Sequence, residues 1–163
     1  MSLGQKLYPH LPFLRRYARA LTGSQTHGDS YVRATLETIV AAPEEFPTDV
    51  DTRLGLYRIF SAIWASANIE EEMTGAGGDG AEQALARARL SRINPLPRQA
   101  LLLTAMEGFT SAEAGAIIGV GAAEIEAGVA QAMEEIERQI RAEILIIEDE
   151  PIIAMDIETI VRD

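Results

Sequence analysis

Residues 96–142 constrain the fold most, because their apolar spacing and turn residues are typical of short helices joined by tight turns. The first helix is predicted to begin near Pro97, since proline suits the first helical turn, and to end before Gly108. Its expected apolar stripe consists of Leu101, Leu102 and Ala105.

A capping box is predicted next, at Thr110-Ser111-Ala112-Glu113, because a hydroxyl there can accept from free amides while the glutamate reaches back to the cap. The short helix that follows is expected to bury Ala114, Ile117 and Ile118. Gly119-Val120-Gly121 then makes the turn into a second helix. Apolar residues recur along that helix at spacings of three or four, at Ile125, Val129, Met133, Ile136 and Ile140. This is the pattern of a helix-turn-helix, although any two packed helices share much of it.

The second of these helices lacks the charge that DNA binding requires. Its ionisable residues between 121 and 136 are Glu124, Glu126, Glu134 and Glu135, with no lysine or arginine. A recognition helix presents cations and amides to phosphates and base edges, whereas carboxylates are repelled and release no counterions. The sequence therefore predicts a helix-turn-helix that keeps its shape and does not bind DNA.

The first 73 residues are predicted to form a three-helix domain. The helices are expected over residues 3–22, 27–42 and 49–72, with prolines at their ends and with aromatic residues of the third helix in the core. Residues 74–80 (TGAGGDG) hold four glycines and form the predicted linker. A further helix, over 81–93, leads into the helix-turn-helix.

Composition excludes several classes of protein. The chain has no cysteine, His10 and His27 are isolated, and no serine lies in a nucleophile motif, so neither a zinc site nor nucleophilic catalysis is predicted. No apolar run is long enough to span a bilayer, and a cytoplasmic protein is expected. Residues 1–70 contain 7 basic residues (lysine and arginine) and 7 acidic ones. The corresponding numbers are 6 and 11 in residues 71–142, and 1 and 7 in residues 143–163. This excess of acid disfavours nucleic acid and favours a basic protein partner.

The segments LPFLRRYARALTG, LYRI and LPRQALLLTAMEGFTSAEAGAIIGV, in that order, resemble a two-domain sigma factor of the extracytoplasmic-function type. The departures fall where such a factor meets polymerase and promoter. Asp29 is the only acid in residues 28–34, which correspond to the segment that would grip polymerase, and Glu70-Glu71-Glu72 stands where the family has a basic cluster. The resemblance therefore implies the shape of a sigma factor rather than its activity.

The tail carries a different pattern. Ile144 to Ile147 is an apolar, β-branched run followed by acids, and an apolar helix is expected after Pro151. This resembles the first strand and helix of a receiver domain, in which Glu148 and Asp149 match the pair that helps to hold Mg²⁺ in a complete receiver. A continuous helix from Gly121 onward is the alternative, since the same run also has helical spacing.

A sigma-like module followed by a receiver resembles the PhyR-type anti-anti-sigma response regulators of the general stress response. The resemblance implies a mainly α protein with a sigma region-2-like domain (1–73), a linker (74–80), a sigma region-4-like domain (81–142) and a truncated receiver (143–163). It also implies a non-enzymatic function, the sequestration of a small anti-sigma protein, gated by phosphorylation of the protein's own receiver by a sensor histidine kinase. The phosphoacceptor lies in the part of the receiver that this sequence does not include, and no bound cofactor, DNA or membrane is expected. A working DNA-binding sigma factor is the alternative function.

Overall fold

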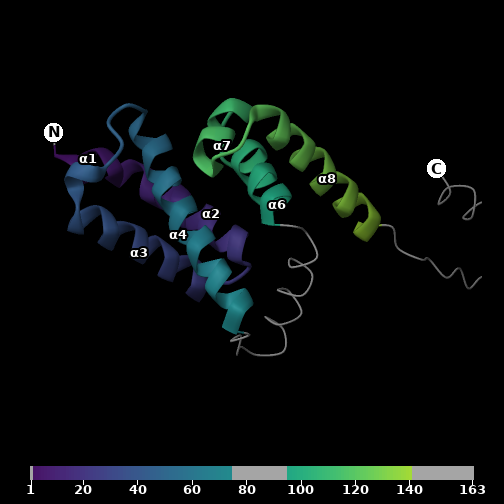
Figure 1. The fold of residues 1–163 in the computed structure, drawn as a ribbon, viewed down its shortest axis with the longest axis horizontal. Coiled ribbons are helices and arrows are strands. Elements are labelled where there is room, and N and C mark those ends of the chain that lie inside the picture. Colours follow the sequence, from purple (N-terminus) through teal and green to yellow (C-terminus); the bar gives the residue numbers. More distant parts are fainter. Residues whose placement is uncertain (1, 75–94, 141–163) are drawn as a thin grey trace, which may run out of the picture. The chain divides into compact units, whose positions relative to one another are not determined.

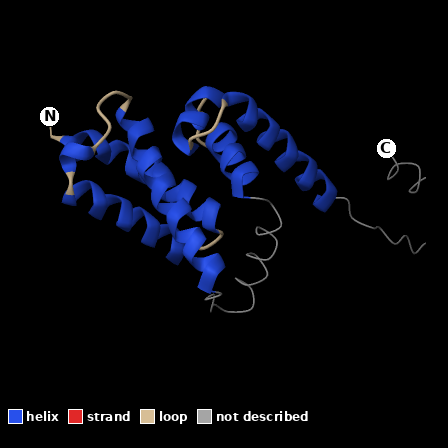
Figure 2. Cartoon of the chain, in the orientation of Figure 1, coloured by secondary structure: helices blue, strands red, loops and turns tan. Residues whose placement is uncertain are grey.

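The computed structural model describes residues 2–74 and 95–140, and all the regular structure in these ranges is helical (Figure 1, Figure 2). In chain order the elements are α1 (Leu3–Leu7), η1 (Tyr8–His10), α2 (Leu11–Thr22), α3 (Gln25–Ala41), η2 (Pro43–Glu45), α4 (Thr52–Thr74), α6 (Pro95–Leu101), η3 (Leu102–Met106), α7 (Ser111–Ile118) and α8 (Ala122–Ile140). The predicted helical module is confirmed for these residues. The predicted helix over 81–93 and the predicted strand over 144–147 lie outside the described residues.

Most of the described helices belong to one compact unit, Met1–Met133. We call residues 2–74 the N-terminal half of this unit and residues 95–133 its C-terminal half. The second unit is Glu134–Asp163, and its described part is the end of α8, where Arg138 pairs with Glu135. Most of the predicted linker lies outside the described residues, so the domain limits given above stay a prediction.

The helical segment predicted over residues 3–22 is divided into α1, η1 and α2. Ser2 and Gln5 form a capping box on α1, and the prolines at 9 and 12 occupy the first turns of η1 and α2. Gly23 ends α2 in the left-handed conformation (φ 65°), which glycine adopts without steric cost. Ser24 then caps α3 by accepting from the backbone N–H of His27.

The core of the N-terminal half lies between α2, α3 and α4, and α3 packs against each of the other two helices. Tyr17, Tyr57 and Phe60 are fully buried, and the ring of Tyr17 lies 5.3 Å from that of Tyr57 and 5.6 Å from that of Phe60. Trp64 is also buried. The predicted aromatic core of the third helix is therefore confirmed, and clustering of this kind stabilises beyond area burial alone.

The C-terminal half begins with a change of helical pitch that the sequence pattern does not predict. Residues Leu102–Met106 form a π-helical turn, η3, directly after α6. An extra residue in a turn rotates the residues that follow it, so the face toward the core changes. Leu103 is fully buried and Ala105 is exposed, so the predicted stripe is wrong at Ala105.

The helix-turn-helix itself is formed as predicted. Thr110 and Glu113 make the capping box of α7, and Gly119 ends that helix at φ 92°. Ile125 of α8 is fully buried, as expected. Met133 is 46% exposed, however, and its neighbour Ala132 is buried in its place. The sequence spacing placed the inward face of α8 one residue too far along at this point.

Across the described ranges, no single helix is both long and apolar enough to cross a membrane. One pair of helices, α7 and Ala122–Arg138, is long and apolar enough when taken together, but the pair is bent by 99°.

Candidate functional site

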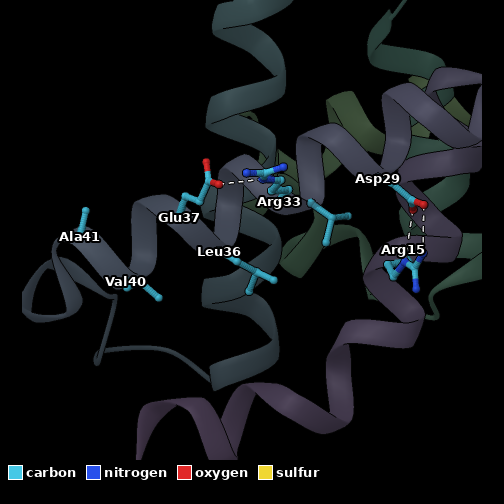
Figure 3. Close-up of a pocket in the computed structure, with 8 residues that line it drawn as sticks. Arg15, Asp29, Arg33, Leu36, Glu37, Val40 and Ala41 are labelled. Carbon is cyan, nitrogen blue, oxygen red and sulfur yellow. Dashed lines mark hydrogen bonds and ion pairs between the residues drawn. The ribbon is translucent and has the colours of Figure 1, made fainter.

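A shallow apolar groove of about 570 Å³ runs along α3 and the neighbouring part of α2 (Figure 3). Its lining consists of Arg15, Asp29, Val32, Arg33, Leu36, Glu37, Val40 and Ala41. All but Arg15 come from α3, so one helix supplies both the floor and most of the rim.

The floor of the groove follows from two apolar rows on α3. One row faces the core and contains Val32, Thr35 and Ile39, which are buried. The other row continues from Val32 through Leu36 to Val40 at intervals of four, and Figure 3 shows Leu36 and Val40 on the same side of the helix. Leu36 is half-buried, whereas Val40 is 78% exposed. Leu36 and Val40 therefore leave part of the apolar floor open to solvent.

Paired charges border this apolar floor. Arg15 of α2 donates to both oxygens of Asp29, with Nη2 2.9 Å from Oδ2, and Arg19 donates to both at 3.0 and 2.7 Å. Arg33 binds Glu37 at 2.8 Å one turn along α3. Each carboxylate on the rim is paired with an arginine. The rim therefore offers hydrogen-bonding groups but has little net charge. This arrangement suits the apolar face of an amphipathic helix with polar residues at its edges.

The two arginines hold the pKa of the Asp29 carboxyl well below its ordinary value of 3.8, chiefly through the hydrogen bond from Arg19 and then that from Arg15. The pKa of Asp29 is lower in the folded protein than in the unfolded chain. The ionised carboxylate therefore stabilises the fold at a pH above 3.8, and this stabilisation is lost as the pH falls toward the folded-state pKa. We therefore expect Asp29→Asn to lower the unfolding temperature at about pH 7. The difference in unfolding temperature between the variant and the unaltered chain should be smaller at about pH 3. Thermal unfolding at both pH values measures this, and a gap that stays constant would contradict the role of Asp29.

The helix that would read DNA carries exposed acids in the structure. Glu124 and Glu126 lie on the exposed face of α8. Along the described part of α8 the only cation is Arg138, which is paired with Glu135. This is the charge pattern that the sequence predicts, and it is unfavourable to a phosphate backbone.

The metal-binding pair predicted from the tail, Glu148 and Asp149, lies outside the described residues. Among the residues that are described, no group of three or more histidine and acidic side chains is placed to hold a metal ion.

Sequence reasoning missed the groove. On the helix expected over 27–42, the structure buries Ile39 and leaves the adjacent Val40 exposed. The signal was present, because α3 has apolar residues at intervals of four in addition to those of its buried face. The clamp on Asp29 was also missed, since it joins positions 10 and 14 residues apart on two helices.

Two families match the chain. Residues 7–61 match the family described as the Sigma2 domain of PhyR, and residues 90–139 match the one described as the sigma-like domain of the response regulator PhyR. The phyllosphere-induced regulator PhyR of Methylorubrum extorquens is 46% identical to this chain over 162 residues. The match covers 99% of this chain but 59% of that relative, so the chain spans well under two thirds of its length.

Solved structures give the same result. The PhyRSL–NepR complex from Sphingomonas sp. Fr1, determined by NMR, contains a chain 60% identical to this one, with a TM-score of 0.68. The match covers 92% of this chain and 96% of that one. The co-crystal structure of the anti-anti-sigma factor PhyR with the anti-sigma factor NepR from Bartonella quintana matches at 41% identity and a TM-score of 0.70, over 99% of this chain and 60% of the other.

Proposed function

The chain belongs to the PhyR family, and we propose that it binds and sequesters a small anti-sigma factor of the NepR type. In this function the sigma-like module imitates a sigma factor in shape and competes with it for the anti-sigma factor. It acts as a binding protein, not as an enzyme. Two of its solved relatives are described as complexes with NepR, which supports this choice of partner.

The observation that carries the proposal is the apolar groove on α3. Its floor leaves Val40 78% exposed on a helix whose other face belongs to the core. Its rim charges, including Asp29, are already paired within the chain. A partner helix can therefore bury its apolar residues on this floor without having to supply a countercharge for each rim residue.

The same features argue against a working sigma factor. Asp29, the one acid that the sequence retains in the polymerase-gripping segment, is bound by Arg15 and Arg19 of its own half. The exposed acids Glu124 and Glu126 of α8 oppose contact with a promoter duplex.

For the whole protein we propose the arrangement that the resemblance implies. Residues 1–73 and 81–142 form the two sigma-like domains, joined by the linker 74–80, and residues 143–163 are the first strand and helix of a receiver. In a complete receiver Glu148 and Asp149 offer carboxylate oxygens, the donor type that Mg²⁺ prefers. Phosphorylation of that receiver by a sensor histidine kinase would shift the competition between receiver and anti-sigma factor for one surface. We place this chain in the cytoplasm.

Isothermal titration of this chain with a NepR-type anti-sigma factor tests the proposal. We expect residues 1–163 to bind on their own, because the groove that carries the proposal lies within them. Val40→Asp places a charge on the apolar floor of the groove, and we expect it to weaken binding by roughly tenfold or more.

Tyr8→Asp is the matched control, since Tyr8 is 75% exposed and lies outside the groove. We expect it to bind like the unaltered chain. If Val40→Asp binds normally, the partner does not use this groove. If the unaltered chain does not bind, or if it binds a promoter duplex with steep salt dependence, the proposed function itself is wrong.

A further inference from the structure

A buried carboxylate joins the two halves of the module. Glu107 directly follows η3 in the C-terminal half, and its side chain has no exposed surface. Among the described residues, it is the only charged residue that is buried. A carboxylate without water requires donors from the protein, because an unpaired buried charge is strongly unfavourable.

All the side-chain donors to Glu107 come from the N-terminal half. Arg16 of α2 donates to Oε1 at 2.8 Å. Tyr57 of α4 donates its hydroxyl proton to Oε2 at 2.7 Å, and Arg53 donates to the same oxygen at 3.3 Å. The two arginines also donate to the backbone carbonyls of Met106 and Glu107. The cluster thus links positions 50 to 91 residues apart in the chain.

Aromatic rings hold these donors in place. The guanidinium of Arg53 lies over the ring of Phe109, 4.2 Å from its centroid, and the ring of Phe109 lies 5.1 Å from that of Tyr57. Stacked guanidinium groups are already oriented, so less freedom is lost when they bind a carboxylate. Phe109 and Glu107 belong to one half, whereas Arg53 and Tyr57 belong to the other.

Two further polar contacts cross the same boundary. The amide of Gln99 donates to the hydroxyl of Ser61 in a buried contact of 3.3 Å, and Arg98 donates to the backbone carbonyl of Leu21 at 3.1 Å. In the first contact both groups are neutral, and in the second Arg98 binds a neutral carbonyl. Glu107 is therefore the point at which separation of the halves would leave a carboxylate without its arginines.

We propose that Glu107 is a latch that holds the two sigma-like halves closed. Within the described residues, the two halves are held together by the apolar core that they share and by these polar contacts. A partner or a neighbouring domain that needs another spacing must first break these hydrogen bonds. The latch therefore sets the balance between a closed and an open module, whichever partner is bound.

The absence of cysteine from the sequence makes a direct test possible. Cysteines introduced at Thr48 and Glu126, which are exposed in the two halves, accept spin labels for distance measurement in the full chain. Glu107→Gln keeps the shape of the side chain but turns an amide group toward the arginines. We expect it to raise the population with the longer label distance on the order of tenfold, with helix content by circular dichroism unchanged.

Asp29→Asn is the matched control, because Asp29 is also held by two arginines but within one half. We expect its label distance to equal that of the unaltered chain. Arg16→Met removes one donor from a side chain that is half exposed, and it should produce a smaller shift in the same direction. An unchanged distance in Glu107→Gln overturns the proposal. If that variant loses helix content, an unchanged distance in Arg16→Met overturns it instead.

Discussion

Replacement of Leu103 with alanine is expected to lower the free energy of unfolding by about 2–5 kcal/mol. Leu103 is fully buried and belongs to the hydrophobic core that both halves contribute to. Its removal leaves a cavity that the surrounding helices fill only in part. Urea unfolding, followed by circular dichroism and by the fluorescence of Trp64, measures the loss.

The control for this experiment lies two residues further along the same π-helical turn. Ala105 is exposed, so Ala105→Ser is expected to change the free energy of unfolding by less than about 0.5 kcal/mol. A regular α-helical stripe would instead place Ala105 in the core, where a hydroxyl is costly. Comparable losses in the two variants would contradict the register of η3.

Replacement of Gly28 with alanine is expected to lower the free energy of unfolding by roughly 1–3 kcal/mol. In a helix this substitution usually stabilises, by about 0.5–1 kcal/mol, because alanine restricts the unfolded chain. At Gly28, however, a Cβ would lie 2.7 Å from the backbone nitrogen of Arg19. Backbone cannot move aside as a flexible side chain can, so α2 and α3 would be forced apart. Thermal and urea unfolding give the sign directly.

Gly4→Ala provides the comparison, because a Cβ at Gly4 meets no atom within 4 Å. It is expected to leave stability unchanged or slightly raised. Stabilisation by both substitutions would show that α2 and α3 do not approach as closely as the structure has them.

The helices were predictable from sequence where local signals determine them. Proline at 9 and 12, glycine at 23 and the Thr110–Glu113 capping box each fix a helix end through contacts a few residues apart. The face of a helix depends on its pitch, and the spacing of apolar residues assumes a regular α-helix. This assumption fails at η3, where the π-helical turn exchanges Ala105 for Leu103 in the core.

The functional groups were less predictable because they depend on contacts between helices. The clamp of Arg15 and Arg19 on Asp29 requires the register of α2 against α3, which periodicity does not give. Glu107 did leave a signal in the sequence. It is the only charged residue between Arg98 and Glu113, in a segment otherwise suited to a core. A lone acid in such a segment needs buried donors, but nothing local identifies Arg53 and Tyr57 as those donors.

The core shared by the two halves limits how this module can be recombined. Phe109 and Glu107 on one side fit Arg53, Tyr57 and Arg16 on the other. A chimaera that joins the first half of one homologue to the second half of another therefore inherits two surfaces that were not selected together. Such hybrids are expected to express poorly unless all five of these residues are transferred together.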